Sequence, residues 1–231
     1  MSDLTRSTAV AVPAFQAEPS VGDVVLRCRE VFDEVLVVDD GSTDGTSDLA
    51  AAAGARIIRH DGNLGKGRAL RTAFDDLFRK GFDQVVTIDA DGQHLPAESP
   101  NLLRVARTGA DLVIGSRDHL FEAMHPIRRL SNRYSSYLIS AVAGLTLSDV
   151  QSGFRLYSKE LIGTVGFPEP RFEAESAVVV RAVRGGFKVR TVPIRLGFAD
   201  GRVTSHYRPI IDSLRIARAV ARARMELVGC R

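Results

Sequence analysis

The chain reads EVLVVDDGSTDGT from Glu34 to Thr46. A continuous apolar run rich in valine is typical of a strand that is buried on both faces of a parallel sheet. Two aspartates follow at once, and then small polar residues and glycines that can form a tight turn and cap a helix. This stretch therefore predicts a strand, a turn and a helix start, with acidic side chains at the point where the strand ends.

The same alternation extends to both sides of this stretch. Short apolar or β-branched runs predict strands at 8–12, 34–39, 55–59, 84–89 and 111–116. Helical patterns lie between them, at 21–31, 46–53, 65–80 and 97–108. Buried strands separated by helices predict a parallel sheet covered on both faces and joined by right-handed crossovers. Ligands bind beyond the carboxyl ends of such strands, so we expect the site in the residues that directly follow them.

The second half of the chain is less regular. Helices are expected at 127–143, 174–184 and 209–228, and strands at 153–157 and 188–196. No internal repeat and no linker rich in glycine, proline or serine divides the sequence. The prediction is therefore one α/β domain with a Rossmann-like, mostly parallel sheet and an elaborated second half.

Composition is typical of a globular protein. The 231 residues are 45% hydrophobic and 26% charged, which excludes a disordered or collagen-like chain. The two cysteines, Cys28 and Cys230, are too few for a disulfide framework, so free thiols in a reducing compartment are expected. No stretch resembles a signal peptide or reaches the roughly 18 apolar residues of a spanning helix. We expect a cytoplasmic protein that touches a membrane only from outside.

Positive charge is concentrated near the C-terminal end. The net charge is +3, yet residues 201–231 hold seven arginines against Asp212 and Glu226. A basic arm suits phosphates, anionic lipid or nucleic acid, or is simply a solvated helix face. No nucleic acid is expected as a partner, because acids crowd the presumed ligand side and aromatic residues do not alternate with the arginines.

The expected helix 209–228 has two distinct faces. Arg215, Arg218 and Arg222 recur at helical spacing and form a basic stripe suited to an anionic membrane surface. Apolar residues recur on another face, which we expect to pack on the domain. They are Ile210, Leu214, Ala217, Ala221, Met225 and Val228.

Carboxylates stand at the expected strand ends. Side chains alternate along an extended chain, so Asp89, Asp91 and Gln93 can point the same way. Their oxygens suit Mg²⁺ or Mn²⁺ rather than zinc, although Asp and Gly also favour plain surface turns. After the 34–39 strand, one of two adjacent acids, Asp40 by preference, can accept hydrogen bonds from a nucleobase or ribose.

Two phosphate-binding motifs are excluded. The stretch around Lys66 has His60 where a P-loop needs its first glycine, and Gly67 where it needs Ser or Thr. No Gly-x-Gly-x-x-Gly follows the first strand, so a dinucleotide fingerprint is absent as well. We expect Lys66 and its flanking glycines to let backbone or ammonium approach a ligand at a helix start.

Taken in order, these motifs resemble those of the family 2 glycosyltransferases, which have a nucleotide-sugar-binding type A fold. The matching runs are 12–15 (VPAF), 40–46 (DGSTDGT), 63–67 (NLGKG), 89–94 (DADGQH) and 152–155 (SGFR). Within that family the chain looks most like the polyprenyl-phosphate (dolichol-phosphate) mannose or glucose synthases. Support for that branch comes from 115–117 (GSR), 128–133 (RRLSNR) and 171–175 (RFEAE).

The resemblance implies a catalytic domain over residues 1–201 and a basic helical extension, 202–231, packed on it. It implies donor binding by Pro13, Phe15, Asp40, Lys66, Asp89, Ala90 and Asp91. The metal, Mg²⁺ or Mn²⁺, would be held by Asp89, Asp91 and Gln93. Catalysis would depend on Asp91, Arg117 and Glu175, and the acceptor phosphate on Arg117, Arg133, Arg202 and His206.

Two positions depart from the family pattern. An acid that often follows the Pro-x-aromatic turn is displaced to Glu18, and a Ser-Lys pair typical of the synthases is here Ser205-His206. The second departure lies in the loop to which the resemblance assigns binding of the acceptor phosphate.

The implied reaction is an inverting, metal-dependent sugar transfer from a donor such as GDP-mannose or UDP-glucose to a polyprenyl phosphate. It would take place at the inner face of a membrane, with or without a separate membrane protein that presents the lipid. A phosphate acceptor is already an anion and needs no base. Two alternatives stay open: a hydroxyl acceptor, with Glu173 or Glu175 as the base, and nucleotidyl transfer, for which a basic, glycine-rich loop after the first strand is missing.

Overall fold

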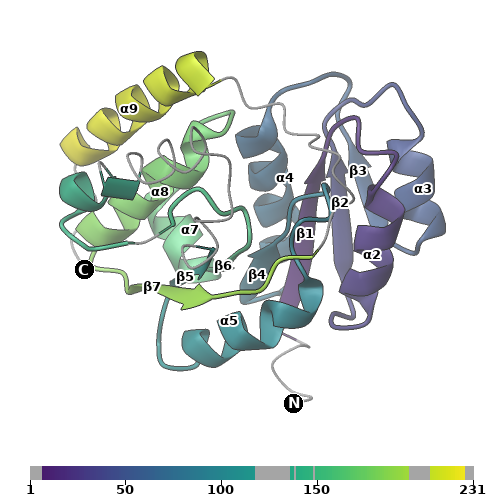
Figure 1. The fold of residues 1–231 in the computed structure, drawn as a ribbon, viewed down its shortest axis with the longest axis horizontal. Coiled ribbons are helices and arrows are strands. Elements are labelled where there is room, and N and C mark those ends of the chain that lie inside the picture. Colours follow the sequence, from purple (N-terminus) through teal and green to yellow (C-terminus); the bar gives the residue numbers. More distant parts are fainter. Residues whose placement is uncertain (1–6, 118–135, 138, 148, 198–208, 227–231) are drawn as a thin grey trace.

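Within the part of the chain that the structure describes, one seven-stranded sheet organises the elements (Figure 1). The structure is a computed structural model and describes residues 7–117, 136–137, 139–147, 149–197 and 209–226. The strands are β1 (Thr8–Ala14), β2 (Val35–Asp39), β3 (Arg56–Arg59), β4 (Gln84–Thr87), β5 (Leu112–Ser116), β6 (Arg155–Ser158) and β7 (Val189–Pro193). Their order across the sheet is β3-β2-β1-β4-β6-β5-β7.

The sheet is mostly parallel, as predicted, but β6 runs against its neighbours. The pairs β1–β2, β2–β3, β1–β4 and β5–β7 are parallel, whereas β6 is antiparallel to both β4 and β5. All seven strands lie within three residues of their predicted bounds. The direction of β6 could not be predicted, because a short apolar run looks the same in either direction.

The strand order reverses next to β1. The chain passes from β1 to β2 and β3 on one side and then returns to β4 on the other side. In open α/β sheets the crevice at such a reversal lies beyond the carboxyl ends of the strands. The segments that follow β1 and β4 therefore flank the expected ligand site.

Helices cover both faces of the sheet, as predicted. The two core clusters place α2 (Val21–Arg29), α3 (Thr46–Ala52) and α5 (Ser99–Ala106) on one face, where the 3₁₀ turn Pro96–Glu98 leads into α5. The other face carries α4 (Lys66–Arg79), α7 (Lys159–Val165), α8 (Glu173–Arg184) and α9 (Pro209–Met225).

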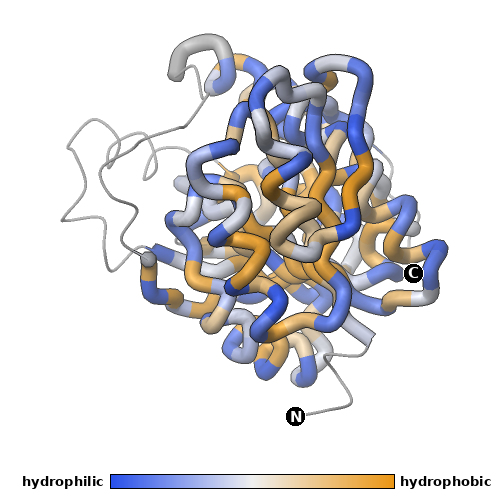
Figure 2. Tube along the Cα trace, turned by 90° about the vertical axis from the view of Figure 1, so that its right-hand side faces the viewer, coloured by the Kyte–Doolittle hydropathy of each residue, from blue (hydrophilic) through white to orange (hydrophobic). Residues whose placement is uncertain are grey.

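Strand side chains alternate between these two layers. In β1, Ala9 and Ala11 join the core on the α4 side, while Val10 and Val12 join the core on the α2 side. Figure 2 shows hydrophobic residues concentrated in the interior and hydrophilic residues mainly toward the periphery. The continuous apolar runs of the sequence are thus explained by burial on both faces.

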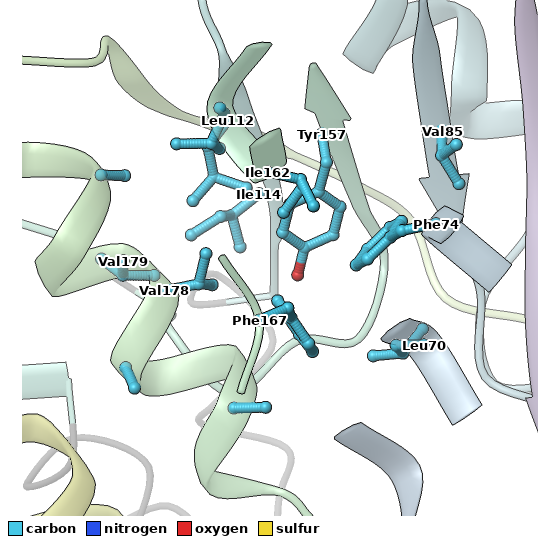
Figure 3. Close-up of a cluster of buried hydrophobic side chains, with 14 of the residues drawn as sticks. Leu70, Phe74, Val85, Leu112, Ile114, Tyr157, Ile162, Phe167, Val178 and Val179 are labelled. Carbon is cyan, nitrogen blue, oxygen red and sulfur yellow. The ribbon is translucent and has the colours of Figure 1, made fainter. Parts of the chain in front are cut away.

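An aromatic cluster ties β6 to α4 (Figure 3). The ring of Phe74 meets the rings of Tyr157 and Phe167 edge to face, with centroid distances of 5.1 and 5.2 Å. Such pairs add about 0.5–1.5 kcal/mol each beyond the area they bury. This cluster holds together the two halves of the chain that meet at the site.

Helix α9 is present, but the predicted apolar face was wrong. The side chains that pack into the core are Ile216, Ala219, Val220 and Ala223. Leu214 and Met225, which were expected to be inward, are 64% and 77% exposed. Ala217 and Ala221 are exposed as well, and the side chains of Ile210 and Val228 lie outside the described residues.

The predicted face, with Leu214 inward, and the observed face, with Ile216 inward, both repeat at a helical period. Periodicity alone therefore could not decide which face is buried. The register found in the structure turns Ile216, Ala219, Val220 and Ala223 into the core, where α9 packs against α8. Arg215, Arg218 and Arg222 are exposed, as predicted.

Some expectations fall wholly or partly outside the described residues. Of the expected helix 127–143, residues 136–137 and 139–143 are described and helical. Cys28 is a buried free thiol, and burial raises its pKa to about 12, whereas Cys230 is not described. Among the described helices, none has the length and apolar character needed to cross a membrane.

Candidate active site

A cavity of about 500 Å³ lies at the carboxyl edge of β1, β2 and β4. The residues that directly follow these strands line it, together with the start of α4, the residues before α8 and the first half of α9. They are Pro13, Ala14, Phe15, Gln16, Ala17, Asp40, Asn63, Gly65, Lys66, Ala69, Asp89, Ala90, Asp91, Arg171, Phe172, Asp212 and Arg215. Every residue predicted to bind the donor is therefore in one cavity wall.

The turn after β1 is fastened to the loop after β2. The backbone N–H of Gln16 donates to Oγ of Ser42 at 2.9 Å, and Oε1 of Gln16 accepts from the N–H of Thr43 at 2.7 Å. These bonds hold Gln16 at a φ of 52°, a left-handed conformation that costs about 1–2 kcal/mol in an L-residue. The displaced acid, Glu18, accepts a hydrogen bond from the N–H of Gly45 at 3.0 Å. Both residues therefore shape the loop, a role that the sequence did not reveal.

The two adjacent aspartates after β2 have different roles. Asp39 is fully buried and accepts hydrogen bonds from the N–H of Ser42, at 2.8 Å, and from the hydroxyl of Ser47. Asp40 lines the cavity, and its carboxylate accepts from the N–H groups of Leu64 and Gly65 at 3.0 and 2.7 Å. Asp40 thus holds the turn that precedes α4 at the cavity wall, and its contact with a nucleobase stays a prediction.

The glycines beside Lys66 are needed for contact within the chain. A Cβ atom on Gly65, whose φ is 102°, would lie 2.5 Å from the carbonyl oxygen of Pro170. A Cβ atom on Gly67 would lie 2.3 Å from the carbonyl oxygen of Glu169. These glycines thus permit a close approach to residues 169–171, and because Gly65 and Lys66 also line the cavity, their approach to a ligand stays a prediction.

Lys66 joins two carboxylates from different parts of the chain. Its Nζ atom lies 2.6 Å from Oδ1 of Asp89 and 2.8 Å from Oε2 of Glu175, beside the ring of Phe172. Burial alone would lower the pKa of Lys66, but the charges of the two carboxylates raise it, so the ammonium stays charged. Burial alone would raise the pKa of Asp89, but the charge of Lys66 holds it below its ordinary value. The sequence predicted Lys66, Asp89 and Glu175 as site residues but not that they would contact each other.

Among the described residues, no lysine forms an ion pair with Asp91 as Lys66 does with Asp89, although the charge of Lys66 also acts on it. One of its oxygens accepts the backbone N–H of Gln93 at 3.0 Å. Burial and the negative charge of Asp89 raise the pKa of Asp91. The side chain of Gln93 is not among the cavity-lining groups. His94, the next residue, is buried and stays neutral, because burial lowers its pKa to about 4.

Asp89 and Asp91 fit a divalent cation. The effect of Asp89 on the pKa of Asp91 indicates that the two negative charges repel each other, and the charges of Lys66 and Arg117 offset this repulsion only in part. Among the described residues, no three His, Cys, Asp or Glu side chains gather as a metal cluster. Mg²⁺ commonly takes one or two carboxylates and completes its shell with water and substrate phosphates, which suits this pair.

The segment before and within β6 supports Asp89 from behind. A Cβ atom on Gly153 would lie 2.3 Å from Oδ2 of Asp89, so the backbone packs directly against the carboxylate. Arg155 is fully buried, and its guanidinium donates to the carbonyl oxygens of Ser152, at 2.7 Å, and of Glu175. This arginine therefore connects the Gly153 segment to the first turn of α8.

Arg117 is paired with an acid that the sequence did not single out. Its Nε and Nη2 atoms donate to the two oxygens of the buried Asp149 at 2.8 and 3.2 Å. Burial opposes its charge, but Asp149 raises the pKa of Arg117, so the guanidinium stays charged. Arg117 does not line the cavity. The other residues expected at the acceptor phosphate, Arg133, Arg202 and His206, lie outside the described residues.

Comparison with known proteins identifies the family of this chain. A model of the family described as Glycosyl transferase family 2 matches residues 9–166, more than half of the chain. The polyprenol monophosphomannose synthase of Mycolicibacterium smegmatis is 32% identical over 210 residues, which covers 82% of this chain and 77% of that protein. The undecaprenyl-phosphate mannosyltransferase of Micrococcus luteus is 31% identical over 196 residues, with coverage of 79% and 80%.

A solved structure confirms the type A fold. Glucosyl-3-phosphoglycerate synthase from Mycobacterium tuberculosis, in complex with Mn²⁺, uridine diphosphate and phosphoglyceric acid, matches with a TM-score of 0.72. The match covers 99% of this chain and 82% of that chain at 22% identity, so it concerns the fold alone. The family match and the two sequence relatives also identify the family, which the fold alone does not. This chain belongs to glycosyl transferase family 2 and is a glycosyltransferase.

Proposed function

We propose that this enzyme transfers a sugar from a nucleotide sugar to the phosphate of a polyprenyl phosphate, with inversion and with Mg²⁺ or Mn²⁺. The single observation that carries the acceptor class is the contact between Lys66 and Glu175, at 2.8 Å. Glu175 is one of the two acids, with Glu173, that were expected to act as a base for a hydroxyl acceptor, and its Oε2 atom already pairs with a charged ammonium. An acceptor that arrives as an anion needs no base. The names of the two sequence relatives, which specify polyprenol and undecaprenyl phosphate, support the same acceptor.

The donor would lie along the cavity from the β1 turn to the carboxylates after β4. Pro13, Phe15 and Asp40 would contact the nucleoside, and the Ala90 segment would border the diphosphate. Asp89 and Asp91 would hold the cation, with Gln93 as a further expected oxygen donor. A bound divalent cation neutralises the charge that develops on the leaving nucleoside diphosphate.

Transfer would proceed in one displacement. An oxygen of the acceptor phosphate forms a bond to the anomeric carbon while the bond from that carbon to the diphosphate oxygen breaks. Attack from the face opposite the leaving group inverts the configuration, and no proton moves. Lys66, fixed beside Asp89, adds a positive charge near the departing diphosphate.

A hydroxyl acceptor is a second candidate, favoured by one observation. Within the described residues, Oε1 of Glu175 and Oε2 of Glu173 are buried and have no hydrogen-bond partner. Either oxygen could receive a proton from a sugar or protein hydroxyl. In that case a Glu175 or Glu173 variant would lose about 10²–10⁴-fold in rate.

The proposal includes peripheral association with a membrane through α9. The face of α9 that would contact the membrane differs from the one expected, because Leu214 and Met225 are exposed. Leu214, Arg218 and Met225 lie on one exposed stripe, since their spacing of four and seven residues returns to the same side of a helix. Apolar side chains flanked by arginine suit the headgroup region of an anionic bilayer. The enzyme would then encounter its lipid acceptor in the same membrane surface to which α9 binds.

A panel assay tests the proposed function. GDP-mannose, UDP-glucose and related donors are incubated with a polyprenyl phosphate and either Mg²⁺ or Mn²⁺. The expected result is metal-dependent release of nucleoside diphosphate together with a glycosylated lipid phosphate. Transfer to sugar or peptide hydroxyls alone, or release of pyrophosphate from a nucleoside triphosphate, would contradict it.

A further inference from the structure

The charges around the cavity are divided between two regions. Asp40, Asp89 and Asp91 stand at the strand ends, and Lys66 is bound to Asp89 and Glu175. Two more cations, Arg171 and Arg215, line the part of the wall that is built by the segment before α8 and by α9. Arg171 belongs to the 171–175 run and Arg215 to the expected basic stripe of α9, but the mechanism proposed above uses neither of them.

Arg171 is positioned but not neutralised. A Cβ atom on Gly65 would lie 2.7 Å from Cγ of Arg171, so the stem of the arginine rests on the turn that Asp40 holds. Its guanidinium forms no ion pair with any described residue, and the residue is exposed. A fixed stem with an available guanidinium is the arrangement that loses least conformational entropy when it binds an anion.

Arg215 is oriented by a buried carboxylate. Its Nη1 atom lies 3.1 Å from Oδ1 of Asp212, one turn earlier in α9, and Asp212 is 3% exposed. An arginine has five N–H donors, so this contact leaves most of them available. The packing of α9 on α8 sets the position of Arg215 relative to Arg171, which lies two residues before the first residue of α8.

We infer that Arg171 and Arg215 form a phosphate-binding subsite in the cavity wall. Arg117, which was expected at the acceptor phosphate, is paired with Asp149 and does not line this cavity. The ligand group is a phosphate, either the monophosphate of the acceptor or the diphosphate of the donor, and this choice rests on the proposed function. Leu214, next to Arg215, is exposed, so a lipid phosphate could reach the cavity past α9 while its chain stays outside.

Binding measurements that need no turnover test the subsite. Arg171→Gln, Arg215→Gln and the double variant are compared with the unchanged enzyme by calorimetry. One titration uses farnesyl phosphate, and a second uses GDP or UDP with Mn²⁺. Arg104→Gln is the matched control, because it removes an exposed arginine from α5 on the opposite face of the sheet. Arg171→Lys and Arg215→Lys keep the positive charge but remove the forked guanidinium, so they test whether binding needs two parallel hydrogen bonds from one side chain.

Each single Gln variant is expected to lower the binding affinity for one of the two ligands by about tenfold or more, as for loss of a charge-assisted hydrogen bond. The Lys variants should recover part of that loss. A loss confined to farnesyl phosphate assigns the subsite to the acceptor, and a loss confined to the nucleoside diphosphate assigns it to the donor. Unchanged affinity for both ligands in the double variant, with the unfolding temperature unaltered, overturns the inference. Failure of the proposed function is separate, since it would show as absence of transfer by the unchanged enzyme.

Discussion

The Nζ atom of Lys66 lies 2.6 Å from Oδ1 of Asp89 and so places a fixed positive charge on the first carboxylate after β4. Replacing Lys66 with Met should leave Asp89 and Glu175 without this cation. We expect kcat to fall by about 10²–10³-fold, as when one electrostatic donor is removed from an active site. Steady-state kinetics measure the fall, and Lys80→Met, an exposed lysine past the end of α4, is the control. Activity of Lys66→Met within threefold of the unchanged enzyme would show that the ammonium has only a structural role.

Glu175→Gln separates the two acceptor classes. With a phosphate acceptor, the variant should retain transfer within about tenfold, because no proton has to be removed. If Glu175 is a base, the loss should reach about 10²–10⁴-fold. Rates with a polyprenyl phosphate and with hydroxyl acceptors are compared on the same preparation, and Glu173→Gln is measured in parallel.

Asp91→Ala should nearly abolish transfer and weaken nucleoside diphosphate binding when Mg²⁺ or Mn²⁺ is present. Asp91 is the carboxylate whose pKa burial and Asp89 raise, so its charge is the one that a cation would most relieve. Binding is measured by calorimetry with and without the metal, and a circular dichroism spectrum checks the fold. Full activity of the unchanged enzyme in a chelator would rule out the metal-dependent mechanism.

Gly153→Ala should reduce activity through Asp89. The added Cβ atom would lie 2.3 Å from Oδ2 of Asp89, so the carboxylate must move. We expect a fall in kcat/KM and weaker metal-dependent binding of the nucleoside diphosphate. Gly163→Ala, at a helix position in α7 with nothing within 4 Å, is the matched control and should stabilise the fold by about 0.5–1 kcal/mol. Equal kinetics for both variants would show that the Gly153 contact is not needed.

Glu226 gives a pH-dependent stability test outside the cavity. It lies 2.6 Å from Nε of the buried Arg181, whose hydrogen bond lowers the pKa of Glu226. A lowered folded-state pKa means that the stabilisation is present above the unfolded-state value and is lost as the pH falls through the folded-state value. Glu226→Gln should cost about 1 kcal/mol or less near neutral pH, because the carboxylate is partly exposed. The difference in urea unfolding between the two proteins should shrink below about pH 4.

Local pattern was sufficient to predict the strands, the carboxylates at the strand ends and the helices on both faces, except the seven-residue helix α7, which was not predicted. These features depend on residues that are close in sequence, such as Asp39 and Asp40 directly after a valine-rich run. The parallel order then brought the β1, β2 and β4 ends to one cavity. Asp40, Asp89 and Asp91 line it for this reason.

Contacts between distant segments could not be predicted in the same way. The partner of Arg117 is Asp149, and the partner of Lys66 is Glu175, and no spacing rule connects either pair. The face of α9 was wrong for a related reason. Two apolar registers were compatible with the helix, and only the surface of α8 decides between Leu214 and Ile216 as the inward residue.

The antiparallel position of β6 has a consequence for synthesis of the chain. β5 pairs only with β6 and β7 among the described strands, and β4 has β6 on one edge. The ribosome adds about 5–20 residues per second. The edges of β4 and β5 that β6 later covers therefore stay unpaired until Arg155–Ser158 has been synthesised. Unpaired edges are templates for association with other chains. The nascent N-terminal half is thus the stage at which we expect this protein to depend most on chaperones.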